Sequence, residues 1–284
     1  MKNALVFFLL SVGMLVNAQQ IDSQDVALNS GQNPSPNESK KYTKNESAFR
    51  PGEWLKFRMH YGFLNASYAT LHVKSNSING KPVYHVVGKG QTTGFASLFF
   101  KVDDTYESYF GMDEDMKPYK FVRNINEGGY TKDYVIDFDH ERDKAILNDK
   151  KNKKTYKFDL QDSIQDLLSA FYYLRNNYDP KDLVQGEAVK LKMLYDDDGI
   201  FDFKLKYLGT EILKTKFGKV KCYKFRPLVQ SGRVFKEKES LTLWVSADDN
   251  RIPIRIQADL AVGSIKVDLE AYNGLKNQFK IIMD

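Results

Sequence analysis

The stretch IPIRIQADLAVGSIKVDLEA, residues 252–271, decides the fold class. Apolar residues take every second position on either side of a Gly263-Ser264 turn signal, and mostly polar or charged residues stand between them. Because successive side chains of a strand point to opposite faces, this alternation predicts two strands with one dry and one solvated side. The short turn between them is typical of an antiparallel hairpin.

The same period of two recurs through most of the chain after residue 48. It is found in residues 53–61, 69–73, 119–125, 130–138, 189–195 and 241–245. Turn signals separate such segments, at Asn79-Gly80, Gly128-Gly129, Asp198-Gly199 and Ser231-Gly232. Short connections of this kind exclude βαβ crossovers, so we expect a mainly β protein with roughly a dozen to fifteen strands. The predicted architecture is a large antiparallel meander, either barrel-like or folded into two curved sheets.

One segment departs from this pattern and predicts a helix laid on the sheet. Between residues 159 and 178 the apolar side chains are spaced three and four apart. They are Ile164, Leu167, Leu168, Phe171 and Leu174. Ser163 followed by Asp166 resembles a capping box, and Pro180 prevents further helix. We therefore expect one amphipathic helix near residues 163–177.

The N-terminus has the pattern of an export signal. Lys2 supplies the positive charge, and Val16-Asn17-Ala18 is a small-residue cleavage site. The apolar run between them has about 13 residues, whereas a bilayer-spanning helix needs roughly 20. Residues 1–18 are thus interpreted as a signal peptide that is removed, which leaves no transmembrane anchor.

The single cysteine, Cys222, bears on location and on stability. It lies far from the export signal, so no cysteine stands where a lipoprotein is acylated. One cysteine also cannot form an intramolecular disulfide, and its place in a predicted strand indicates a packing role. We expect an exported protein, periplasmic or secreted, that is not a lipoprotein.

Composition predicts the domain organisation. Residues 19–47 are rich in Ser, Asn, Gln and Lys and nearly devoid of apolar residues, which is typical of a disordered linker. Hydrophobic residues make up 42% of the whole chain, enough for a packed core in residues 48–284, which we interpret as a single β-rich domain. The net charge of +5 is spread along the chain, which argues against nucleic-acid binding.

Several residue groups could carry chemistry, but each has a simpler interpretation. His72 and His85 flank a predicted turn and could converge on a metal, yet the sequence offers no clear third ligand, and His60 and His140 stand apart. The run Asp196-Asp197-Asp198-Gly199 lacks the spacing of a calcium loop and fits a turn. The glycine-rich residues 88–94 match neither common phosphate-binding pattern and fit a bent strand.

Catalytic motifs are also missing from the sequence. There is no Gly-x-Ser-x-Gly elbow, and Asp162 and Asp166, although on one predicted helix face, fit the positive end of a helix better than an acid–base pair. We therefore assign no catalytic, cofactor-binding or metal-ligating residue and no cofactor. The residues of a binding site stay unidentified.

Short motifs in a fixed order resemble a known family. They are residues 49–55 (FRPGEWL), 61–62, 69–71, 162–164, 170–175 (AFYYLR), 243–249 (LWVSADD) and 251–254. Following an export signal, they resemble an uncharacterised family of exported bacterial proteins, a domain of unknown function with a β-rich, YmcC-like fold. The resemblance covers residues 48–284. It implies an envelope location and antiparallel β structure, and it brings no activity, cofactor or site residue.

The sequence favours a non-enzymatic protein that binds or scaffolds a component of the cell envelope, either a ligand or a protein. If the ligand is a lipid or a glycan, a cavity lined by Phe and Tyr should lie between sheet and helix. One alternative is a secreted hydrolase that acts on glycans through a carboxylate pair. A second alternative is an outer-membrane β-barrel, because many alternating strands follow the signal.

Overall fold

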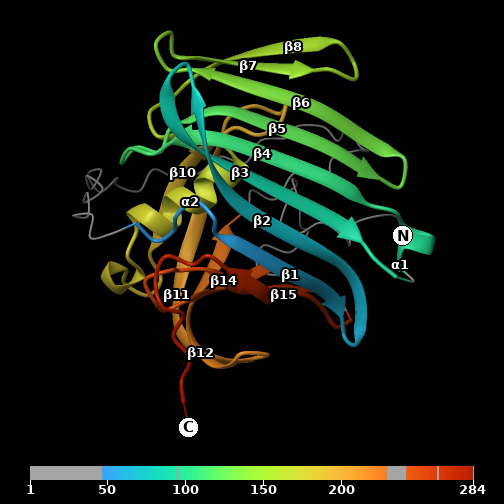
Figure 1. Ribbon diagram of the computed structural model, residues 1–284, viewed down its shortest axis with the longest axis vertical. Helices are drawn as coiled ribbons and strands as arrows, with labels where there is room; N and C mark the ends of the chain where they lie inside the picture. Colours follow the sequence, from blue (N-terminus) through green and yellow to red (C-terminus); the bar gives the residue numbers. More distant parts are fainter. Residues whose placement is uncertain (1–46, 95, 229–240, 261, 284) are drawn as a thin grey trace, which may run out of the picture.

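The computed structural model describes residues 47–94, 96–228, 241–260 and 262–283. The predicted signal peptide, nearly all of the predicted linker and the Ser231-Gly232 turn lie outside these residues. The described chain is mainly β, as the alternating pattern predicts (Figure 1).

Fifteen strands form one sheet whose neighbours are almost always consecutive in the chain. The strands of the first half are β1 (Trp54–Tyr61), β2 (Leu64–Ile78), β3 (Lys81–Thr92), β4 (Asp103–Gly111), β5 (Pro118–Glu127), β6 (Tyr130–Asp139), β7 (Lys144–Asp149) and β8 (Lys154–Asp159). Those of the second half are β9 (Ile164–Gln165), β10 (Ala188–Met193), β11 (Phe201–Thr215), β12 (Gly218–Leu228), β13 (Leu241–Ser246), β14 (Pro253–Asp259) and β15 (Ser264–Asn273).

The two halves of the meander join through β1 and β15, which pair antiparallel. All other pairs are antiparallel except β9 with β10, which run parallel. The sheet curls strongly but does not close, because β8 and β9 stand at its two ends without pairing to each other (Figure 1). The large antiparallel meander is confirmed. The sequence left open a barrel-like form or two curved sheets, and the structure has one sheet that curls like a barrel without closing.

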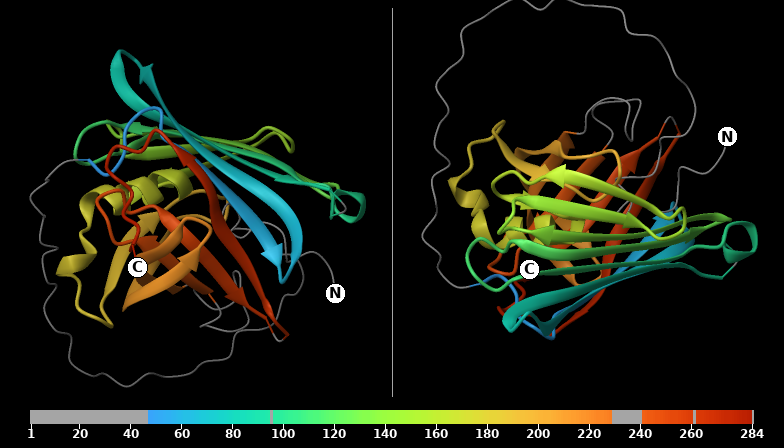
Figure 2. Two further views of the ribbon diagram at one scale, coloured as in Figure 1. Left: turned by 60° about the horizontal axis from the view of Figure 1, so that its bottom comes forward. Right: turned by 90° about the horizontal axis from the view of Figure 1, so that it is seen from above.

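The predicted helix forms as α2 (Leu167–Asn177), on the concave side of the curled sheet (Figure 2). It begins later than the Ser163–Asp166 pair indicates. Asp166 is the N-cap: its carboxylate accepts the backbone N–H groups of Leu168 and Ser169, and the Ser169 hydroxyl accepts the N–H of Asp166. Ser163 has a positive φ of 58°, so it turns the chain before the helix starts.

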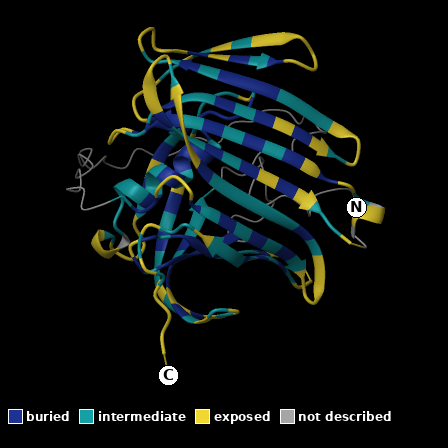
Figure 3. Cartoon of the chain, in the orientation of Figure 1, coloured by how far each residue is buried: buried dark blue, intermediate teal, exposed yellow. Residues whose placement is uncertain are grey.

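Two short helices complete the fold, α1 (Ala96–Phe99) between β3 and β4 and the 3₁₀ turn η1 (Pro180–Asp182) after α2. The alternating pattern gives no signal for α1. Buried residues alternate with more exposed ones along many strands (Figure 3).

Three hydrophobic clusters make up the core. The first packs α2 against strands of the first half and against β10. The second joins β1 and β15 with β11 to β14. The third is smaller and lies on β11, β12 and β13. Ala69 and Leu71 touch the first and second clusters, whereas Leu174 and Phe203 touch the first and third.

Candidate ligand-binding cavity

A cavity of about 160 Å³ lies between α2 and the sheet. Its walls come from α2, from β1 and β2 on one side, and from β10 to β14 on the other. The residues that shape it include Phe57, Ala69, Phe171, Phe203 and Leu243. The cavity lies between sheet and helix, where the sequence places one if the ligand is a lipid or a glycan. Phenylalanines line the cavity as expected, whereas no tyrosine does so among the described residues.

The cavity lies where the three clusters meet. Ala69, Leu71, Leu174 and Phe203, which each touch two clusters, all line it. Ala69 and Ala170 carry only methyl groups where sheet and helix face each other, so neither side chain fills the space. A concave, mostly apolar space of this kind is the usual form of a small-molecule site.

The chemistry of the walls limits what the cavity can hold. Among the described lining residues, Thr70 alone has a polar side chain, and none has an ionisable one. A comparable apolar cavity of about 150 Å³ stays dry and binds benzene. Sugars need hydrogen-bond partners for their hydroxyls, and this wall offers almost none. The arrangement therefore suits an apolar group such as a segment of an alkyl chain.

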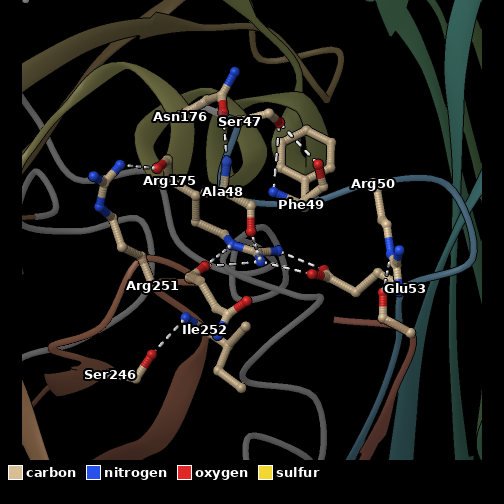
Figure 4. Close-up of polar contacts among 12 residues, drawn as sticks. Ser47, Ala48, Phe49, Arg50, Glu53, Arg175, Asn176, Ser246, Arg251 and Ile252 are labelled. Atoms are coloured by element: carbon tan, nitrogen blue, oxygen red, sulfur yellow. Dashed lines mark hydrogen bonds and ion pairs between the residues drawn. The ribbon is translucent and has the colours of Figure 1, made fainter. Parts of the chain in front are cut away.

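A buried ion pair holds α2, one wall of the cavity, in place (Figure 4). Arg175, near the C-terminal end of α2, donates from Nη1 and Nη2 to both carboxylate oxygens of Glu53 at 2.6 and 2.8 Å. Its Nε donates to the carbonyl of Asn250 at 3.0 Å. Both side chains are buried. The guanidinium therefore ties the helix to the start of β1 and to the turn between β13 and β14.

Three of the motifs that carry the family resemblance converge on this ion pair. Glu53 belongs to residues 49–55, Arg175 to residues 170–175, and Arg251 follows the LWVSADD motif. Arg251 donates from Nη1 to the carbonyl of Arg175 at 2.6 Å, which adds a second contact to the end of the helix (Figure 4). The charged side chains of these motifs position the helix, since they bind one another or the backbone and none of them lines the cavity.

A second buried ionic cluster joins the two halves of the sheet. Arg123, on the inner face of β5, pairs with Asp196, which lies between β10 and β11. Lys132 of β6 also contacts Asp196, at 2.6 Å. Although burial opposes it, Arg123 and Lys132 hold the pKa of Asp196 below its ordinary value. The predicted turn at Asp198-Gly199 is present, but no local pattern indicates that Asp196 is an ionic partner inside the fold.

Asp104 of β4 and Glu127 of β5 form a carboxyl pair beside Arg123. Asp104 Oδ1 accepts the backbone N–H of Asn126 at 2.9 Å. Asp104 Oδ2 and Glu127 Oε1 are buried and receive no hydrogen bond from any described N–H or O–H group. Burial, and then the hydrogen bond and charge of Asp104, raise the pKa of Glu127 to about 8. A proton shared between the two carboxyls satisfies both oxygens.

The carboxyl pair predicts that stability falls as the pH rises from about 4.5 to about 8. The folded state holds the proton of Glu127 up to about pH 8, whereas the unfolded chain releases it near the ordinary pKa of 4.5. Stability therefore falls as pH rises through this window. Glu127→Gln cannot ionise and still offers an N–H to Asp104, so its stability relative to wild type should improve from pH 5 to pH 9. Urea midpoints at both values measure this, with exposed Glu114→Gln as the control. Equal responses of the two variants would refute the shared proton.

The other candidate residues are spread over the outside or built into local structure. His72 and His85 are diagonal neighbours on β2 and β3, as the turn between them implies. His85 contacts Glu107 at 2.7 Å, whereas His60 contacts Asp268 and His140 the carbonyl of Pro118. In the described parts of the chain, no group of three or more His, Cys, Asp or Glu side chains is placed to hold a metal ion.

Asp162 and Asp166 do not form a carboxylate pair. Asp162 is exposed, whereas Asp166 is buried as the cap of α2 and accepts the Ser108 hydroxyl at 2.5 Å. Cys222 is buried in β12, where burial raises the pKa of its thiol to about 12. Gly88 and Gly90 lie inside β3. None of these groups lines the cavity.

The fold and the cavity define a class of protein: a curled, open antiparallel sheet that holds a helix and an apolar cavity in its concave face. The chain belongs to DUF3108, a family of proteins of unknown function, which matches residues 56–270. This confirms the resemblance to an uncharacterised β-rich family. No curated protein matches the chain.

Solved structures with related shapes are distant in sequence. A beta-barrel-like protein of the unknown-function domain DUF1849 from Brucella abortus is 10% identical, with 78% of this chain and 96% of that chain covered and a TM-score of 0.49. A Bacteroides fragilis protein with a YmcC-like fold, provisionally classed as exported, is 10% identical over 81% of this chain and 100% of its own, with a TM-score of 0.33. A Parabacteroides distasonis protein, provisionally classed as a lipoprotein, is 12% identical over the same shares, with a TM-score of 0.32.

Within the described residues, no helix combines the length and the apolar character needed to cross a bilayer.

Proposed function

We propose that the protein is a non-enzymatic binding protein for an apolar molecule, which it holds between α2 and the sheet. The observation that carries this proposal is the cavity, whose described walls offer one hydroxyl and no ionisable group. Entry of an alkyl or isoprenoid chain into such a space lowers the free energy, because the apolar surface of the chain leaves water.

The proposal includes location and domain organisation. Residues 1–18 act as an export signal, the mature chain works in the periplasm or outside the cell without acylation, and residues 48–284 form one domain. The signal pattern, the position of the only cysteine and the motif order support this part. Of the two ligand classes expected from the sequence, the apolar wall favours a lipid over a glycan.

Binding of a fluorescent apolar probe tests the proposal. We expect 1-N-phenylnaphthylamine to bind saturably, at one molecule per chain, and lauric acid to displace it. Ala69→Phe should weaken binding at least about tenfold, because the added ring occupies the cavity; a tenfold change corresponds to about 1.4 kcal/mol. Ala69 stands opposite Gly90 of β3, which has no side chain, and opposite Phe57 of β1, which itself lines the cavity, so the added ring takes up cavity space beside Phe57.

Ser77→Phe is the matched control, because it adds the same ring to an exposed position of the same strand, outside the cavity. It should bind the probe like wild type. Absence of saturable binding by the wild-type chain, or equal affinities for Ala69→Phe and Ser77→Phe, would overturn the proposal. Urea unfolding of both variants verifies that each is folded.

A further inference from the structure

Large apolar side chains project into solvent from three turns of the sheet. Phe63 and Leu64, in the β1–β2 turn, are 91% and 59% exposed. Leu98 of α1 is 77% exposed, and Val262, between β14 and β15, is 78% exposed. We refer to these four side chains as the apolar tips. Single exposed apolar residues are ordinary, but a group of large ones at one end of a molecule marks an interaction site.

The three turns lie next to one another. The Tyr61 hydroxyl, at the end of β1, donates to the carbonyl of Val262 at 3.0 Å. The backbone N–H of Thr93, just before α1, donates to the carbonyl of Ala66 near the start of β2 at 3.3 Å. The β1–β2 turn, α1 and the β14–β15 turn accordingly appear on the same side of the molecule, at the right of Figure 1.

Charge around the tips does not select an ionic partner. Exposed Lys101 and Asp103 follow α1, and Asp259 and Lys266 stand on either side of the β14–β15 turn. Charges of both signs therefore flank the tips without a net excess. Association at this end has to rely on burial of apolar side chains, which salt does not screen.

The walls of the cavity extend toward the same end. Leu241, one of the lining residues, pairs with Ala258 of β14. The next pair along β14 is Asp259 with Ser264, which brackets the turn that carries Val262. An apolar lining that reaches within a few residues of the tips gives a chain from a bilayer a short route into the cavity.

We propose that this end of the molecule docks on a lipid bilayer by inserting the apolar tips. Separate tips on three turns suit a fluid surface that closes around each side chain, whereas a protein partner needs one continuous complementary patch. The choice of lipid over protein rests on the proposed apolar ligand, for which a bilayer is the source. Docking itself is measurable without any ligand in the cavity.

Tryptophan placed at a tip reports insertion directly. The Phe63→Trp chain is mixed with vesicles of phosphatidylcholine brominated in the acyl chains, and its fluorescence is compared with that in unbrominated vesicles. We expect quenching that is the same at 50 mM and 500 mM salt. Ile212→Trp, at a 57% exposed position on β11, should show no quenching beyond that of the native tryptophans.

Vesicle flotation supplies the second arm. The variant Phe63→Ser/Leu64→Ser/Val262→Ser should float at least about a hundredfold less than wild type, because each lost apolar side chain reduces partitioning roughly tenfold. Ile212→Ser should float like wild type. No quenching at Phe63→Trp, or equal flotation of the triple variant and wild type, would overturn the docking proposal. Probe binding in solution is unaffected by this outcome, so the two proposals fail separately.

Discussion

Replacing Arg175 by leucine is expected to lower the free energy of unfolding by about 3–5 kcal/mol, because it leaves the Glu53 carboxylate buried without its partner. The wild-type guanidinium bonds both oxygens of Glu53 and the carbonyl of Asn250, all inside the fold. Leucine packs against the neighbouring aromatic rings but offers none of these N–H groups. The helix end also loses its tie to the sheet, so probe binding should weaken in step with stability.

Urea unfolding of Arg175→Leu measures this loss, with Lys144→Leu as the matched control. Lys144 of β7 and Asp159 of β8 form an ion pair whose side chains are both exposed, so water screens the charges. The control should therefore change stability little. An Arg175→Leu chain as stable as Lys144→Leu would show that the buried pair does not hold the helix.

Gly274→Ala is expected to be comparably damaging, at about 2–5 kcal/mol, because two costs add. Gly274 has a positive φ of 66°, which an alanine adopts only with strain. A Cβ at this position would lie 2.1 Å from the carbonyl oxygen of Gly52, a backbone atom that cannot rotate away. The substitution therefore pushes the end of β15 away from the segment that carries Glu53.

Gly129→Ala separates the two costs, since its φ is also positive, at 96°, and nothing lies within 4 Å of the added methyl. This variant should lower the free energy of unfolding only by the strain of an alanine at positive φ, about 1–2 kcal/mol. Thermal or urea unfolding of both variants gives the difference. If both variants lose the same free energy of unfolding, the contact of the added methyl group with Gly52 does not destabilise the fold.

The strands were predictable because the alternation of apolar and polar residues within each strand shows which of its faces is buried. In residues 252–271 every second residue is apolar, and the structure places β14 and β15 there. The start of α2 was harder to place, since Ser163–Asp166 and Asp166–Ser169 are both spaced like a capping box. The helix begins after Asp166 and not after Ser163, because Ile164 and Gln165 form β9, which pairs with β10. That pairing is not visible in the local sequence.

The cavity and the ionic clusters could not be derived from local patterns. Ala69 and Ala170 look like ordinary strand and helix residues, and only the curl of the sheet brings them to the same space. Asp196 looks like part of a polar turn, and its partner Arg123 lies 73 residues away in the chain. A charged residue at an inward position of an alternating strand, as Arg123 is in β5, is the one sequence signal that could have indicated a buried pair.

The central claim is that the space between α2 and the sheet holds an apolar molecule. Native mass spectrometry of the protein, purified without detergent from the cells that make it, tests this most directly. We predict one bound apolar molecule per chain in wild type and in Ser77→Phe, and a bare chain for Ala69→Phe. Identical spectra for wild type and Ala69→Phe, with or without an adduct, would contradict the claim.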